Sequence, residues 1–204
     1  MFMAFFTLLI VASVPLLGGR LSLLSTIRIK YSWVILVALA VQVLITVVVP
    51  GRAPHAVLVA AHVATYVMAG YVVWVNRRLP GLVVLGFGAL LNAVTITLND
   101  GTLPASPRAL AAAGIKIDPH EFNNSGAVHH PVLAFLGDIM ATPRWLPFPN
   151  VISIGDVIIL VGAAMLLHGV SRSIAGRQLA RFMPRSFSRG GGRHRAPVPS
   201  FGIG

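Results

Sequence analysis

Five apolar stretches, each close to the length that crosses a bilayer, constrain this chain more than any other feature of its sequence. As a helix, about 20 residues at 1.5 Å per residue span the hydrocarbon core. The composition agrees, because 56% of the 204 residues are hydrophobic and only 10% are charged. The sequence therefore predicts an all-α fold, a polytopic membrane helix bundle of about five transmembrane helices. The helices are expected over residues 2–17, 32–49, 56–75, 82–98 and 151–170.

The distribution of basic residues between these stretches predicts an orientation. If the N-terminus is outside, the cytoplasmic segments carry twelve Arg and Lys residues and the outer segments carry four. Lys and Arg accumulate on the cytoplasmic side of membrane proteins. The first stretch has no basic residue before it, so we expect an uncleaved anchor rather than a signal peptide. The chain is expected in a cell membrane as a multi-pass protein, with the N-terminus outside and the C-terminus in the cytoplasm.

The bounds of the predicted helices divide the chain into four parts. Residues 1–98 hold four helices, 99–150 form an extracytoplasmic loop region, 151–170 form the fifth helix, and 171–204 form a basic, largely disordered tail. The loop region holds four of the five acidic residues, so function is expected there. Within it, 107–113 is Ala-rich and suited to a short helix. The apolar run 132–141 is too short to span and predicts a short interfacial or re-entrant helix.

Polar residues within or beside the apolar stretches mark a candidate polar pocket that faces outward. An ionisable group inside a bilayer is expensive unless it faces protein, water or a partner. The offsets between the three polar residues of the fourth stretch place them on one helix face. Asp156 is expected about two turns into the fifth helix, and Asp138 from the short segment is expected to approach it. The candidate residues are Asn92, Thr95, Asn99, Asp138, Asp156 and His62.

The same polar residues can also have purely structural roles, without forming a pocket. Asp156 can simply accept a hydrogen bond from Asn92 or Asn99, because polar contacts between membrane helices are common and weak. Gln42 is typical of a polar contact between helices, and Asp138 can pair with Arg144 at the surface. The neighbouring histidines at 129 and 130 lack two further ligands at a fitting spacing, so no metal site and no cofactor are predicted.

The basic tail is expected to bind anionic lipid headgroups rather than nucleic acid. Basic segments beside a membrane gain about 1 kcal/mol per Arg or Lys from anionic lipids. A short amphipathic helix over 171–183 is expected, and Pro184 prevents its continuation. The candidate headgroup contacts are Arg172, Arg177, Arg181 and Arg185.

Four short motifs give the chain a resemblance to a known family. They are Gly18-Gly19-Arg20, Leu98-Asn99-Asp100-Gly101 with Pro104, Leu136-Gly137-Asp138 with Pro147, and Ser153-Ile154-Gly155-Asp156. In their order and spacing the chain resembles an uncharacterised family of small bacterial multi-pass integral membrane proteins, a domain of unknown function. The resemblance covers residues 1 to about 170. It implies the membrane architecture and no activity, cofactor or catalytic residue.

Three classes of function are compatible with the sequence. A non-catalytic partner or assembly subunit needs a stable bundle, small residues for close helix packing, and recognition loops. A membrane-embedded enzyme at the outer surface would use Asp138, Asp156 and His130 as acid and base groups. A carrier of small molecules or ions usually has repeated halves or interrupted helices, which this sequence lacks. The absence of Cys excludes disulfides and thiolate catalysis. The first class is preferred, with a membrane protein as the partner.

Overall fold

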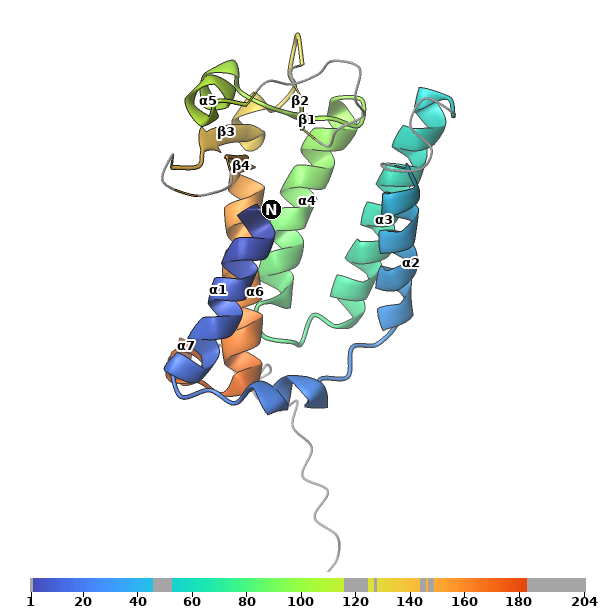
Figure 1. The fold of residues 1–204 in the computed structure, drawn as a ribbon. Helices are drawn as coiled ribbons and strands as arrows, with labels where there is room; N and C mark the ends of the chain where they lie inside the picture. The colour runs from blue at the N-terminus through green and yellow to red at the C-terminus, as the bar shows by residue number, and fades with distance from the viewer. Residues whose placement is uncertain are drawn as a thin grey trace, which may run out of the picture.

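The structure is a computed structural model that describes residues 2–45, 53–115, 125–126, 128–143, 146 and 149–182. Its described part is mostly helical, with the longer helices running side by side and a small group of short elements at one end (Figure 1). The predicted second helix beyond residue 45, together with Arg144 and Arg185, lies outside the described residues.

Helices occupy all five apolar stretches over the described residues. Their bounds are α1 Phe2–Leu16, α2 Ser32–Val43, α3 His55–Val75, α4 Leu82–Leu98 and α6 Ile154–Ser171. The short 3-10 helix η1, Leu21–Thr26, follows α1, and α7, Ile174–Phe182, follows α6. Among the described helices, α3 and α6 are long and apolar enough to cross a membrane, and α1, α2 and α4 are shorter apolar helices.

Glycines allow α4 and α6 to pack with their backbones close together. A Cβ atom on Gly88 of α4 would lie 2.6 Å from the carbonyl oxygen of Gly155 in α6. A Cβ atom on Gly162 of α6 would lie 2.3 Å from the backbone nitrogen of Leu85 in α4. Small residues at such positions let helices approach more closely than larger side chains permit. Helix α6 also contacts α1, while α2 packs on α3 and α3 packs on α4 (Figure 1).

Large apolar side chains cover the outward faces of the helices. Leu8 of α1, Leu36 of α2, Val67 of α3 and Leu90 of α4 are all exposed. A soluble protein rarely exposes so continuous an apolar surface, whereas lipid solvates it. Together with the two helices long and apolar enough to span, these exposed side chains suggest a membrane protein.

The short elements at one end of the bundle form what we call the cap. It consists of β1 Leu103–Pro104, α5 Pro107–Ala113, β2 Ser125–Gly126, the 3-10 helix η3 Ala134–Leu136, β3 Asp138–Ala141 and β4 Val151–Ser153. Strands β1 and β2 pair in parallel, and β3 and β4 pair antiparallel with Asp138 opposite Ser153. A small apolar core holds the cap together, made of Ala105, Ala109, Leu110 and Val151.

Two expectations about this region are corrected and one is confirmed. The fold is not all-α, because the cap contains four short strands among the described residues. The run 132–141 is not an interfacial or re-entrant helix but η3 followed by β3. Leu133 has a left-handed backbone (φ 54°), and beyond Gly137 the chain is extended and pairs with β4, so a helix cannot continue. The short helix expected over 107–113 is present as α5.

Candidate functional site

Asn92 and Asp156 join α4 to α6 beneath the cap. The Asn92 Nδ2 atom donates a hydrogen bond to Asp156 Oδ1 over 2.9 Å. Ser153 Oγ, which is fully buried, donates to Asn92 Oδ1 over 2.9 Å. The amide of Asn92 is therefore bonded at both its nitrogen and its oxygen, and it links two residues of the fifth apolar stretch.

Asp156 also forms the start of α6. Its Oδ2 atom accepts a hydrogen bond from the Ser153 N–H over 3.1 Å, and its own N–H donates to Ser153 Oγ over 3.0 Å. This reciprocal pair is a capping box, which satisfies donors that have no partner within the helix. A carboxylate in the first turn also interacts favourably with the helix dipole. The expected depth of two turns is wrong, because residues 151–153 form β4 and the helix begins only at Ile154.

Asn99 forms hydrogen bonds with the backbone of the cap segment around Val132. Its Nδ2 atom donates to the carbonyl oxygens of Thr95, over 2.7 Å, and Val132, over 2.8 Å. Its Oδ1 atom accepts from the Val132 N–H over 2.8 Å. Thr95 is fully buried, and its hydroxyl donates to the carbonyl oxygen of Leu91. Asn99 thus fixes the segment before η3 to the end of α4, and within the described chain its hydrogen bonds go to Thr95 and Val132 rather than to Asp156.

Asp138 is a buried carboxyl in the cap. Only 4% of the residue is exposed, and Ser125 Oγ donates to its Oδ2 atom over 2.5 Å. Its Oδ1 atom is buried and has no hydrogen-bond partner among the residues that the structure describes. Burial raises the pKa of Asp138 from 3.8 to about 6; the Ser125 hydrogen bond opposes this rise and the charge of Asp156 adds to it. Asp138 can therefore hold a proton in mildly acidic conditions.

His62 belongs to a separate polar cluster between α2 and α3. Its Nδ1 atom lies 2.7 Å from Gln42 Nε2, and its Nε2 atom lies 3.1 Å from the Tyr66 hydroxyl. The Thr65 hydroxyl donates to Gln42 Oε1 over 3.1 Å. Because Gln42 Nε2 can only donate, Nδ1 accepts, and a neutral His62 carries its proton on Nε2 and donates to Tyr66. His62 is fully buried, and every polar atom of its ring has a partner.

The six residues of the candidate pocket therefore occupy several sites. Asn92 and Asp156 are bonded, and Asp138 lies opposite Ser153 in the strand pair above them. His62 faces α2. His129 and His130 are exposed, and no hydrogen bond of the described chain joins His130 to either aspartate. Among the described residues no group of three or more His, Cys, Asp or Glu side chains could hold a metal ion.

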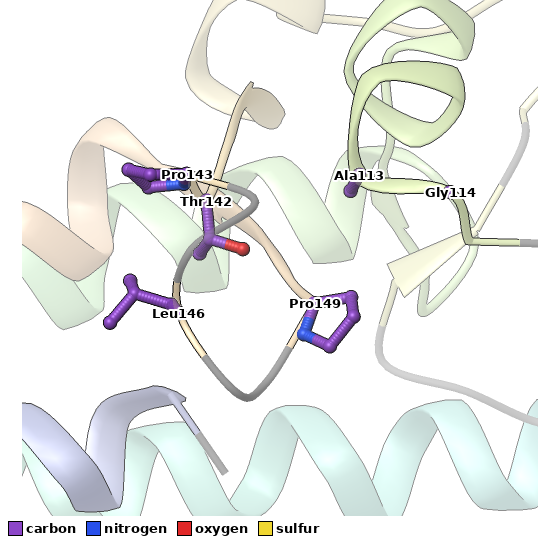
Figure 2. Close-up of a pocket in the computed structure, with 6 residues that line it drawn as sticks. All are labelled: Ala113, Gly114, Thr142, Pro143, Leu146 and Pro149. Atoms are coloured by element: carbon purple, nitrogen blue, oxygen red, sulfur yellow. The ribbon is translucent and has the colours of Figure 1, made fainter.

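A small cavity lies elsewhere in the cap (Figure 2). Its volume is about 140 Å³, and its lining is largely apolar, with one threonine hydroxyl. That hydroxyl accepts a hydrogen bond from the Asn150 N–H over 2.9 Å. The lining residues are Ala113, Gly114, Thr142, Pro143, Leu146 and Pro149. None of the candidate pocket residues lines this cavity.

A second buried polar cluster lies at the end of the bundle opposite the cap. His168 Nε2 lies 3.1 Å from Ser13 Oγ of α1, and His168 Nδ1 lies 2.9 Å from Ser173 Oγ. Ser173 Oγ in turn accepts from the Gly176 N–H at the start of α7. This cluster connects α1, α6 and α7, and sequence reasoning missed it because serine and histidine at these spacings match no known pattern.

The basic candidates lie at this same end. Arg172, Arg177 and Arg181 are exposed, and the Arg177 guanidinium donates to the carbonyl oxygen of Arg172 over 2.7 Å. Helix α7 contains Arg177 and Arg181. The apolar residues Ala175 and Leu179, four positions apart, lie on the opposite face of this helix. The tail therefore begins as an amphipathic helix.

Sequence reasoning also missed residues for which a signal existed. The spacing of Ser153 and Asp156 is that of a capping box, which predicts a helix start at that point. His55 and Asp100 form an exposed pair over 3.0 Å that joins the start of α3 to the turn after α4. Ser125 had no signal, because its contact with Asp138 depends on the cap fold.

Comparison with known proteins places the chain in a family. Residues 26–168 match the model of a family of unknown function, DUF5317. The chain belongs to this family. The resemblance expected from the sequence motifs is confirmed, and three of the four motifs lie inside the matched range.

One curated relative supports the same placement. A protein of Thermotoga maritima, described as an uncharacterized protein, is 29% identical over 94 residues, which are 45% of this chain and 52% of that protein. The match thus spans about half the length of the relative. No solved structure matches the chain significantly.

Proposed function

We propose that this member of DUF5317 is a five-span protein of the bacterial cell membrane that acts as a non-catalytic partner or assembly subunit. In this arrangement α1, α2, α3, α4 and α6 cross the bilayer, the N-terminus and the cap lie outside, and α7 lies at the cytoplasmic surface. The apolar outward faces of the helices and the twelve-to-four distribution of basic residues support the topology.

The structural hydrogen bonds of Asp156 support the non-catalytic part of the proposal. Both of its carboxylate oxygens accept hydrogen bonds from the chain itself, one from Asn92 and one from Ser153. These bonds occupy one lone pair on each oxygen, and both serve the fold rather than a substrate. Asp156 starts α6 and holds it against α4, so its proposed role is to build a rigid platform for the cap.

The alternative of a membrane-embedded enzyme rests on Asp138. Its raised pKa, about 6, suits proton transfer near neutral pH. Its carboxyl is buried, however, and the exposed His130 has no hydrogen bond to it in the described chain. A carrier of small molecules or ions ranks third, because the described helices show no repeated halves.

Anionic lipid headgroups are the proposed partners of the cytoplasmic side. All five acidic residues of the sequence lie between positions 100 and 156, so the segments assigned to the cytoplasm contain none. Their exposed cations, including Arg172, Arg177 and Arg181, therefore have no acidic side chain in the same segments with which to pair. An amphipathic helix beside a basic surface is suited to the interface of an anionic bilayer. The same arrangement supports Arg185 as a further contact, and no nucleic acid is proposed.

Site-specific photo-crosslinking in native membranes tests the assembly role. A photoreactive residue at Arg108 or Ala111, which are exposed on α5, should give a discrete protein adduct. The same residue at Leu90, which is exposed on α4, should give none, because it faces lipid. If α5 gives no adduct, and Asp138→Asn abolishes an activity while the protein accumulates normally, the enzyme alternative replaces the proposal.

A further inference from the structure

Four large apolar side chains project from the cap within nine residues. Val132 is 47% exposed, Phe135 62%, Ile139 40% and Met140 36%. We call these four residues the apolar ridge. The one charged residue between positions 128 and 141 is Asp138, and its side chain is buried. The ridge therefore presents apolar atoms without an exposed charge.

Several backbone groups of the ridge segment are hydrogen-bonded within the protein. Asn99 bonds both the N–H and the carbonyl oxygen of Val132. The Leu136 N–H donates to the Leu133 carbonyl over 2.8 Å, and the Gly137 N–H donates to the Ala134 carbonyl over 3.1 Å.

Strand β3, which carries Ile139 and Met140, forms backbone hydrogen bonds with two different segments. The Asp138 carbonyl accepts from the Ser106 N–H over 2.9 Å, and β3 pairs with β4. Water would satisfy such groups in an ordinary loop, whereas a segment in contact with lipid must satisfy them within the protein. Apolar side chains on an internally bonded backbone are the combination that lipid contact requires.

The ridge also continues a surface that faces outward on α4. Leu90, Val94 and Leu98 are exposed at intervals of four residues, which places them along one face of that helix. η3 contacts α4, and Asn99, the next residue after Leu98, holds Val132. The first ridge residue, Val132, thus lies at the same end of α4 as the exposed Leu98.

We propose that the apolar ridge inserts into the acyl chains of the outer leaflet beside the end of α4. This inference rests on the proposed membrane topology and deepens it, since it assigns lipid as the ligand of one side of the cap. The cap would then be held at two depths, by Asn99 to the end of α4 and by Phe135 and Ile139 to the bilayer. The side of the cap that carries α5 remains in water for a partner.

Spin labelling tests the insertion, because the natural chain has no cysteine and each variant carries a single label site. Phe135→Cys is compared with Leu98→Cys on the exposed face of α4 and with Ala111→Cys on α5. The labelled protein is reconstituted in vesicles of phosphatidylethanolamine and phosphatidylglycerol. Collision rates with oxygen, which concentrates in the acyl chains, and with a water-soluble nickel chelate are then measured.

The label at position 135 should behave as the one at 98 does, with oxygen collisions exceeding nickel collisions several-fold, while position 111 shows the opposite ratio. If position 135 resembles 111 while 98 stays lipid-like, the ridge lies in water and the inference is wrong, although the topology stands. Shielding of position 135 from both reagents would place a protein on the ridge and also overturn it. If position 98 itself is water-exposed, the proposed membrane topology fails. Ile139→Cys gives an independent second probe of the ridge.

Discussion

The side chain of Asn99 binds both backbone groups of Val132, a residue 33 positions away in the sequence. Its Nδ2 atom donates to the Val132 carbonyl and its Oδ1 atom accepts from the Val132 N–H, each over 2.8 Å. An asparagine at the C-terminal end of α4 thereby replaces the partner that a neighbouring strand would supply. This side chain therefore holds the first residue of the apolar ridge at the end of α4.

Substitution Asn99→Ala should loosen the segment around Val132 without unfolding the helices. It removes the partner of two partly buried backbone groups of Val132, at a cost below the roughly 1–3 kcal/mol of a fully buried group left unsatisfied. Hydrogen exchange measured by mass spectrometry should accelerate over residues 128–141 and stay unchanged in α3. Thr97→Ala is the matched control, because Thr97 is exposed and bonds only within α4. Equal exchange in both variants would show that Asn99 does not hold the segment.

Two substitutions at Asp156 should show whether this side chain stabilises the fold through its hydrogen bonds or through its charge. Asp156→Ala removes the acceptor of Asn92 and of the Ser153 N–H, so we expect a loss of about 2–3 kcal/mol and a lower thermal midpoint in detergent. Asp156→Asn keeps one acceptor oxygen and should lose less. A double-mutant cycle with Asn92→Ala should show coupling, because the two side chains are bonded. Normal stability of Asp156→Ala would contradict the scaffold role.

The stability of the protein should fall as pH rises through about 6. In the folded state the pKa of Asp138 is about 6, above its ordinary value of 3.8, so the folded protein binds this proton more tightly than the unfolded chain does. The stabilisation is complete below about 3.8 and is lost as pH passes 6. At about 1.4 kcal/mol per pKa unit, the loss is at most about 3 kcal/mol.

Asp138→Asn should remove this dependence on pH, because asparagine stays neutral. Thermal midpoints in detergent between pH 4.5 and 8 should decline for the natural protein and stay flat for the variant. Asp100→Asn, at an exposed position, controls for the loss of a carboxylate from the cap end. Parallel curves for the natural protein and Asp138→Asn would contradict the assignment.

Reporter fusions should place the cap and the tail on opposite sides of the membrane. A reporter that is active only in the periplasm should work when fused after Gly126 and fail when fused at the C-terminus. The reason is the excess of basic residues in the segments assigned to the cytoplasm. The reverse pattern would move the cap into the cytoplasm and overturn the topology.

The tail should bind vesicles through charge. A peptide of residues 171–204 should bind vesicles that contain phosphatidylglycerol at low salt, and binding should weaken as salt rises. Replacing Arg177 and Arg181 with Gln should reduce binding, because each cation contributes separately. Vesicles of phosphatidylcholine alone are the control. Equal binding to both kinds of vesicle would show that the apolar face of α7, rather than its arginines, carries the interaction.

The helices of the fold could be predicted because their signal is local and repeated over many residues. The expected stretch 82–98 matches α4 residue for residue, and the start of α3 differs by one position. The cap could not be predicted in the same way. Strand β3 pairs with β4 across an intervening loop, and β1 pairs with β2 across some twenty residues, so neither pairing leaves a local pattern.

The candidate site was predictable only in part, for a related reason. Helical spacing placed Asn92 and Asn99 on one face of α4, but the two side chains lie two turns apart and contact different partners. The partner of His62 was also set by helix packing, because α2 rather than α6 faces it. Spacing along one helix specifies a face, whereas the neighbour on that face depends on how the other helices pack.

The contacts of α6 have a consequence for how the protein is made. This helix touches α1, η1, α4, β4 and α7, yet it is the last of the five apolar helices to leave the ribosome. Until these residues are made, α1 and α4 lack the surface of α6 against which they pack, and Asn92 lacks Asp156 and Ser153. The pairs α2–α3 and α3–α4 can form before that point, so a chain that ends before residue 154 can keep those contacts but loses every contact that α6 makes.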